Sequence, residues 1–302
     1  MNRPNLRHIP SAISVSIVLI CSLWAIPTLA KDPFRVTRQH QIGDKTEATF
    51  NAVFRDGNYV AAQNYVKQAL VSEPNEPLLY GMAAAFAYTN KDNDSLSSYS
   101  QKTLDSAQKL VAIDPLRGNI YLAVGHFLQG ATILVNQGTV NGASGALDEL
   151  RQVYDYLDKA QAIDSTDPEL NLVRGYMDLA IAVNVPFSSP DQALERLQKY
   201  AAPRYLAQRG LALGHRDLGQ NAEALVAVEQ ALKAAPNNPE LYYLKAQILV
   251  KQGQSQNNPA LYQEALNNFN IAVQKKNQLP ASIARQIERE RQRDLERLNR
   301  PT

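Results

Sequence analysis

Two stretches of the chain repeat one spacing of small residues: residues 57–74 read GNYVAAQNYVKQALVSEP and residues 219–236 read GQNAEALVAVEQALKAAP. In both, alanine stands five and twelve positions after the glycine, and proline ends the stretch. Small residues seven positions apart on an amphipathic segment predict a helix packed closely against a neighbour, and the proline marks its end. The repetition therefore predicts an all-α fold of stacked helices.

A second kind of helix carries an aromatic residue followed four positions later by a small one. Tyr80 with Ala84 and Tyr121 with Gly125 show this spacing. With helices of the two kinds in alternation, the chain resembles the tetratricopeptide-repeat (TPR) family, whose helix–turn–helix unit has about 34 residues. The resemblance implies an α-solenoid of about six repeats over residues 43–277, in which helix pairs bury their apolar stripes against each other.

The copies match the family unevenly, and the differences predict irregular turns. Insertions between helices are expected at residues 91–98 and 130–146, the second a flexible, glycine-containing run. Within residues 239–277 the turn is about seven residues longer than the family unit allows. Helix starts are better defined, because an acceptor side chain before proline caps a helix. Four such pairs occur: Asp167-Pro168, Ser189-Pro190, Asn238-Pro239 and Asn258-Pro259.

Residues 1–30 have the features of a secretory signal peptide. A short basic start precedes an apolar run over residues 9–26, and small residues suit cleavage after Ala30. An uncleaved membrane anchor is the alternative, since the apolar run approaches the length of a bilayer span. Pro27 favours cleavage because it ends the helix. Lipid attachment at Cys21 is disfavoured because a bulky isoleucine precedes it.

Cleavage would leave a chain of balanced charge. The first 30 residues carry two of the 31 basic side chains and none of the acidic ones, which leaves 29 of each sign. No excess of positive charge then remains to attract nucleic acid or an anionic membrane. The only cysteine also lies in the signal peptide, so the exported chain is held by burial rather than by disulfides. Residues 31–42 are expected to be a linker.

Residues 278–302 are predicted to form a charged helix. Its apolar residues, Ile283, Ile287, Leu295 and Leu298, follow one narrow stripe along a helical face. A basic partner-binding helix is one interpretation. We favour a solvating cap over the last repeat, because acidic residues alternate with the arginines and terminal repeats need a polar outer face.

The sequence shows no pattern typical of a catalytic or metal site. Its four histidines are at His8, His40, His126 and His215, without a second ligand at metal-binding spacing. The glycines of residues 138–145 lack the lysine of a phosphate loop. Asp155 and Asp158 could in principle act as an acid–base pair, but a solvated helix face explains them better. We therefore expect a non-enzymatic protein with no cofactor and no metal.

The family resemblance implies a binding groove on the concave face, lined by the first helices of the repeats. Carried over by position, it implies seven candidate groove residues: Tyr88, Leu122, His126, Leu172, Tyr176, Tyr243 and Gln247. Chaperone-binding members have a Lys and Asn pattern there that clamps a terminal carboxylate, and this chain departs from it. An aromatic groove of this kind would suit a segment of a partner protein.

These observations predict an exported TPR protein of bacterial type that acts as a protein–protein interaction scaffold or assembly factor. Its expected location is a periplasm or lumen, and membrane contact is expected only if residues 9–30 are retained as an anchor. Two alternatives stay open. One is an enzyme with an active site that the sequence does not reveal, and the other is a structural protein that assembles end to end.

Overall fold

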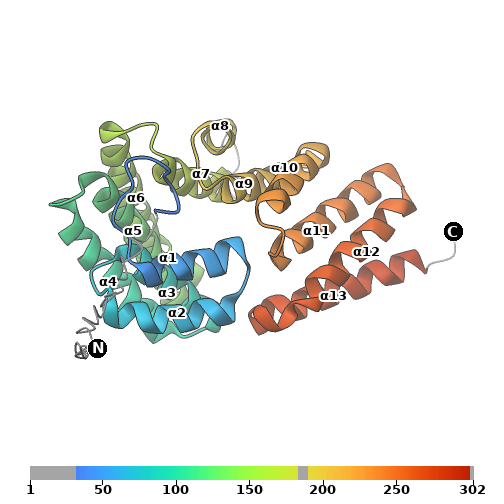
Figure 1. Ribbon diagram of the computed structural model, residues 1–302, viewed down its shortest axis with the longest axis horizontal. Coiled ribbons are helices and arrows are strands. Elements are labelled where there is room, and N and C mark those ends of the chain that lie inside the picture. Colours follow the sequence, from blue (N-terminus) through green and yellow to red (C-terminus); the bar gives the residue numbers. More distant parts are fainter. Residues whose placement is uncertain (1–31, 183–189, 300–302) are drawn as a thin grey trace, which may run out of the picture.

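The computed structural model describes residues 32–182 and 190–299, so the predicted signal peptide and the cap at Ser189 lie outside the described residues. Within these ranges every regular element is helical, and no strand occurs (Figure 1). The predicted all-α class is confirmed.

The α-helices differ in length, from short pieces to one helix of 27 residues. They are α1 (Asp44–Phe50), α2 (Tyr59–Ser72), α3 (Pro77–Asn90), α4 (Asn93–Val111), α5 (Pro115–Asn141), α6 (Ala143–Ile163), α7 (Pro168–Ala182), α8 (Asp191–Lys199), α9 (Arg204–Asp217), α10 (Asn221–Ala234), α11 (Pro239–Gln256), α12 (Pro259–Gln274) and α13 (Ala281–Leu298). A π-helical segment, Asn51–Arg55, continues α1, and a 3-10 turn, Lys276–Gln278, precedes α13.

Consecutive helices pack in pairs: α1 with α2, α3 with α4, α5 with α6, α7 with α8, α9 with α10 and α11 with α12. The first helices of successive pairs also contact one another, from α1 to α3 and on to α11. Among the described residues this gives the six predicted repeats, with α13 packed on α12 after the last of them. Proline at the helix starts follows a capping side chain: Asn238 and Asn258 accept from Glu240 N and Ala260 N, at 2.9 and 3.0 Å.

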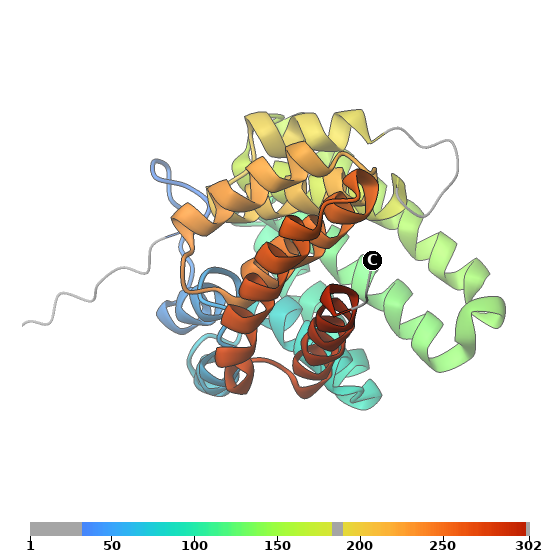
Figure 2. The same ribbon diagram turned by 90° about the vertical axis from the view of Figure 1, so that its right-hand side faces the viewer.

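The predicted insertions are helical extensions, and the prediction of a flexible run at residues 130–146 is wrong. Most of that run lengthens α5 and α6 into a hairpin that extends away from the other pairs (Figure 2). Gly138, with φ +79°, interrupts α5, and a Cβ built on Gly142 would stand 2.9 Å from Gly138 O. Residues 91–98 likewise belong mainly to α4, and the extra residues of the last repeat prolong α11 to Gln256.

Within the described residues, α5 is the one helix with the length and hydropathy to cross a membrane. Half of its most apolar window is buried inside the protein. A core helix has the same composition, so this is weak evidence of a membrane span.

Gly125 lies at a close approach of α5 to α4. A Cβ built on Gly125 would stand 2.5 Å from Leu104 Cδ2 and 3.2 Å from Leu104 N. Gly125→Leu is therefore expected to lower the free energy of unfolding by about 1–3 kcal/mol through overpacking, as measured by denaturant unfolding. Gly81→Ala is the control, because a Cβ there meets only Val124 Cγ1 at 3.6 Å. Equal stability of Gly125→Leu and the wild type would refute this packing.

The first repeat contacts the start of α11, so the array of repeats closes on itself. Asn238 Nδ2 donates to Phe54 O at 3.1 Å, and Tyr59 OH donates to Glu240 Oε1 at 3.2 Å. Gly57, with φ +62°, leaves room for this approach, because a Cβ there would stand 2.6 Å from Asn238 Oδ1. Repeats far apart in the sequence therefore share one packed interior.

The segment expected as a linker is part of the core. Residues 32–43, the N-terminal strap, run along the helices with Phe34 and Ile42 buried. The Phe34 ring meets the Phe50 ring edge-on, with 5.0 Å between centroids. The Nδ1 atom of His40 contacts the Asp114 carboxylate at the start of α5. The strap therefore joins the first repeat to the N-terminal ends of α5 and α7.

Arg35 ties the strap to α7. Its Nη1 lies 2.9 Å from both Glu169 Oε2 and Asp32 Oδ2, and its Nη2 lies 2.5 Å from Asp167 Oδ2. All four side chains are buried. Burial acts to lower the Arg35 pKa, but the three carboxylates outweigh it and raise the pKa, so the guanidinium stays charged. Buried charges of this kind are stable only when each is paired.

Arg117 of α5 extends the same cluster. Its Nη2 lies 2.9 Å from Glu76 Oε1 and its Nε lies 3.3 Å from Glu169 Oε2. Tyr121 OH donates to Glu169 Oε1 at 2.6 Å. Burial raises the Glu76 pKa, and Arg117 opposes that rise. The carboxylates stand at the N-termini of α3 and α7, where the helix dipoles favour negative charge. We call these residues the buried ion cluster: Asp32, Arg35, Glu76, Arg117, Asp167 and Glu169.

Candidate functional site

Three of the candidate groove residues belong to the protein interior. Leu122 and Leu172 keep 4% and 6% of their surface exposed and belong to the same core cluster as Phe34 of the strap. Tyr176 packs against that cluster and donates its hydroxyl to Leu206 O at 2.8 Å. The prediction that these three line an open groove is wrong, because their side chains pack into the core that the closed array shares.

Two further candidates lie apart from any shared recess. Tyr88, near the end of α3, is 58% exposed. His126 is half-buried between α5 and α6, with its Nδ1 atom 2.7 Å from Glu149 Oε2. Its ring stacks on Tyr156 with 5.3 Å between centroids. These contacts hold the long hairpin together, which is a structural role.

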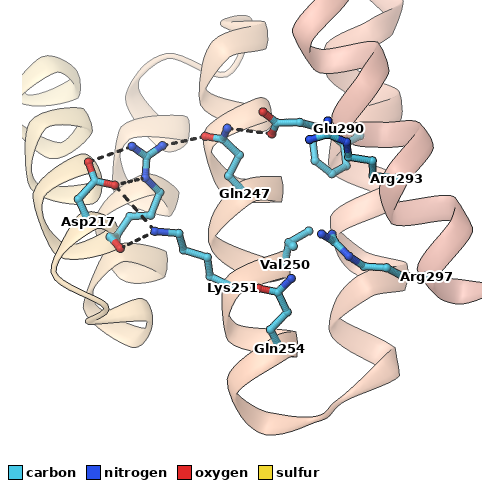
Figure 3. Close-up of a pocket in the computed structure, with 10 residues that line it drawn as sticks. Asp217, Gln247, Val250, Lys251, Gln254, Glu290, Arg293 and Arg297 are labelled. Carbon is cyan, nitrogen blue, oxygen red and sulfur yellow. Dashed lines mark hydrogen bonds and ion pairs between the residues drawn. The ribbon is translucent and has the colours of Figure 1, made fainter.

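The last two candidates, Tyr243 and Gln247, meet one carboxylate. Tyr243 OH donates to Glu290 Oε1 at 2.7 Å, and Gln247 Nε2 donates to Glu290 Oε2 at 2.9 Å. Arg216 Nη1 donates to Gln247 Oε1 at 2.8 Å, which fixes the amide orientation. Burial and the bond to Glu290 raise the Tyr243 pKa, so its hydroxyl stays protonated. The line of contacts joins α9, α11 and α13 (Figure 3).

Beside this line lies a recess of about 390 Å³, which we call the C-terminal recess. Its wall combines four cations, two carboxylates, two amides and two apolar side chains. They are Arg216, Lys251, Arg293 and Arg297; Asp217 and Glu290; Gln247 and Gln254; Val250 and Phe269. Arg293 and Arg297 extend from α13 toward α11 (Figure 3). The recess is therefore made by the last repeat, the preceding first helix and the C-terminal helix together.

Sequence reasoning found Gln247 but missed most of the recess. Arg293 and Arg297 stand four positions apart, so a shared helical face could have been inferred for them. The charge pattern around them indicated only a solvated face. Lys251 and Gln254 lie beyond the inward positions carried over from the family. Their place in the recess wall depends on the packing of α13, which the local sequence does not predict.

Asp294 lies behind the recess in an environment that disfavours its charged form. Its side chain is buried, and neither carboxylate oxygen accepts a hydrogen bond within the described residues. The nearest cation is Arg297, whose Nη1 is 3.7 Å from Asp294 Oδ1. Burial raises the Asp294 pKa to about 6, although Arg297 opposes the rise. Compared with the unfolded chain, the folded protein therefore holds the proton of Asp294 to a higher pH.

A raised pKa in the folded state means that stability falls as the acid ionises, here from about pH 4 to about pH 6. Asp294→Asn removes this ionisation. We expect the variant to melt about 2–4 °C higher than the wild type at pH 7 and at a similar temperature at pH 4. Thermal unfolding at the two pH values measures this. Glu296→Gln, at an exposed site on the same helix, is the control, and an identical pH dependence of Asp294→Asn and the wild type would contradict the burial of an unpaired acid.

Within residues 32–182 and 190–299, no group of three or more His, Cys, Asp or Glu side chains could hold a metal ion. The arrangement of the C-terminal recess is suited to binding: hydrogen-bond donors and cations converge on a concave surface, and apolar groups line its floor.

Comparison with known proteins matches one stretch of the chain to a family model. Residues 215–256, from the end of α9 to the end of α11, match the family model described as tetratricopeptide repeat. Residues 215–256 therefore form a tetratricopeptide repeat. The matched TPR residues include Arg216, Gln247 and Lys251 of the recess, whereas Arg293 and Arg297 come from the helix that follows the repeats. TPR domains in general bind protein partners.

A solved structure also matches: TTC0263, described as a thermophilic TPR protein in Thermus thermophilus. The match covers 79% of this chain and 91% of that chain, with 18% sequence identity and a TM-score of 0.31. A comparison with curated proteins gave no match.

Proposed function

We propose that this TPR protein is a non-enzymatic scaffold that holds a segment of a partner protein in the C-terminal recess. The observation that carries the proposal is the convergence of α9, α11, α12 and α13 on one concave surface with hydrogen-bond donors and apolar floor residues. Leu122 and Leu172 of the middle repeats are buried, whereas Lys251, Gln254 and Arg293 of the recess wall are exposed and can meet a partner.

We further propose that the protein works outside the cytoplasm, in a periplasm or lumen. The support is the sequence of residues 1–30, with its basic start, apolar run and small residues before a cleavage point. Cleavage after Ala30 would leave one residue before Asp32, a member of the buried ion cluster.

The experiment is affinity capture from cell-envelope fractions with the wild type and Gln254→Trp. Gln254 is an exposed residue of the recess wall, so an indole there fills the recess without disturbing the core. Gln263→Trp, on an exposed face of α12 away from the recess, is the matched control. We expect the captured partner to fall about tenfold with Gln254→Trp and to stay with Gln263→Trp. Equal recovery with both variants would overturn the proposed function.

A further inference from the structure

The charged side chains of the C-terminal recess do not balance. Asp217 is the one carboxylate of its wall paired with cations: it lies 2.8 Å from Arg216 Nε and 3.9 Å from Lys251 Nζ. Arg293 is exposed and makes no hydrogen bond or ion pair within the described part of the chain. Arg297 lies 3.7 Å from the nearest acid, Asp294, which is longer than a hydrogen bond. Positive charge therefore faces the recess without a full set of partners.

The second carboxylate of the recess, Glu290, does not neutralise these cations. Its oxygens accept from Tyr243 OH at 2.7 Å and from the side-chain amides of Gln247 and Gln286 at 2.9 and 3.1 Å. All three donors are uncharged. Glu290 also shows that the donors of α11 are placed to hold a carboxylate at this position.

The excess of positive charge is local. The chain outside residues 1–30 has equal numbers of basic and acidic residues, so no overall field draws anions to the protein. Several exposed ion pairs elsewhere join one acid to one base, as Lys199 joins Glu195 at 2.6 Å. In the recess, by contrast, Arg293 has no acid within the described residues and Arg297 has one only at 3.7 Å, so an acidic ligand would find charge to pair with there.

We propose that the C-terminal recess binds an acidic segment of the partner protein, with one carboxylate between Arg293 and Arg297 and another beside Lys251. This inference rests on the proposed function and names the chemistry of its partner. The apolar floor of Val250 and Phe269 covers the backbone and side-chain carbons of the segment. Binding is expected to weaken with rising salt, because its charges are only partly buried.

Fluorescence anisotropy with two labelled dodecapeptides tests the proposal, one of alternating Glu and Ala and one of alternating Gln and Ala. At low salt we expect the Glu peptide to bind at least about tenfold more tightly than the Gln peptide. The double variant Arg293→Glu/Arg297→Glu should lose at least about tenfold of that affinity, and Arg289→Glu should lose less than about twofold. Arg289 lies on the same helix, exposed and outside the recess, so it is the control for a change of charge. Thermal unfolding verifies that each variant is folded.

Equal affinity for the two peptides, or unchanged affinity in the double variant, would overturn the inference. Complete displacement of the Glu peptide by millimolar inorganic phosphate would also overturn the inference, because the recess would then be a site for a single ion. The capture experiment distinguishes failure of the acidic-partner inference from failure of the proposed function. A partner that is lost with Gln254→Trp but retained with Arg293→Glu/Arg297→Glu supports the proposed function and refutes an acidic partner. A partner retained with both variants refutes the proposed function itself.

Discussion

Replacing Glu169 by alanine is expected to lower the free energy of unfolding by about 3–5 kcal/mol, the largest effect of any single substitution considered. Glu169 is fully buried and accepts from Arg35, Arg117 and Tyr121 at once. Its removal leaves two buried guanidinium groups with fewer carboxylates than they need. Denaturant unfolding of the wild type and the variant measures the difference.

The control for this prediction is Glu195→Ala, which breaks an exposed ion pair with Lys199 on α8. Exposed pairs of this kind contribute little to stability because water and salt screen them. Limited proteolysis adds a second readout, because loss of the cluster should release the N-terminal strap and expose it to cleavage. If the free energy of unfolding of Glu169→Ala is less than about 1 kcal/mol below that of the wild type, the cluster does not hold the strap in place.

Asn238→Ala is expected to cost about 2–4 kcal/mol. Asn238 caps α11 by accepting from Glu240 N, and it donates from its amide to Phe54 O in the first repeat. The substitution removes the cap and also leaves a carbonyl without its partner inside the packed interior. Thermal and denaturant unfolding both report this loss.

Asn258→Ala is a matched control within the same chain. Asn258 also precedes proline and caps its helix, α12. Among the described residues it makes no hydrogen bond to the first repeat. We expect it to cost about 1 kcal/mol. The difference between the two variants measures the contact that closes the array. Equal losses for Asn238→Ala and Asn258→Ala would mean that this contact adds no stability.

The elements that local chemistry determines could be predicted from the sequence. The alanine and glycine spacing of residues 57–74 and 219–236 predicted the helix pairs, because close helix packing requires small residues wherever it occurs. The caps at Asn238 and Asn258 could also be predicted, since a cap depends on two or three neighbouring residues. Each of these features depends on residues that are close together in the sequence.

The buried ion cluster could not be predicted in this way. Arg35 and Asp167 are 132 positions apart, and nothing near Arg35 in the sequence distinguishes it from a solvated arginine. The sequence predicts only a linker for the segment that carries it, residues 31–42. Only the convergence of the first helices, with their acidic N-termini, makes a binding site for its guanidinium.

The candidate groove was predicted only in part for a related reason. Positions carried over from the family assume an open concave face, but the contact between Phe54 and Asn238 closes the array. Leu122, Leu172 and Tyr176 therefore lie in the interior, whereas Tyr243 and Gln247 lie beside a recess. The glycines of residues 138–145 led to the wrong prediction of a flexible run. The run is part of the α5–α6 hairpin, because the packing of α5 on α6 outweighs the weak helix propensity of glycine.

The measurement that tests the binding site most directly is photo-crosslinking in living cells, with a photoreactive residue placed at position 254 or at position 263. Gln254 lies on the recess wall and Gln263 on the outer face of α12. We predict a specific adduct with a partner protein from position 254, weakened when Arg293→Glu/Arg297→Glu is introduced, and none from position 263. Adducts of equal yield from both positions, or from position 263 alone, would contradict the assignment of the C-terminal recess as the binding site.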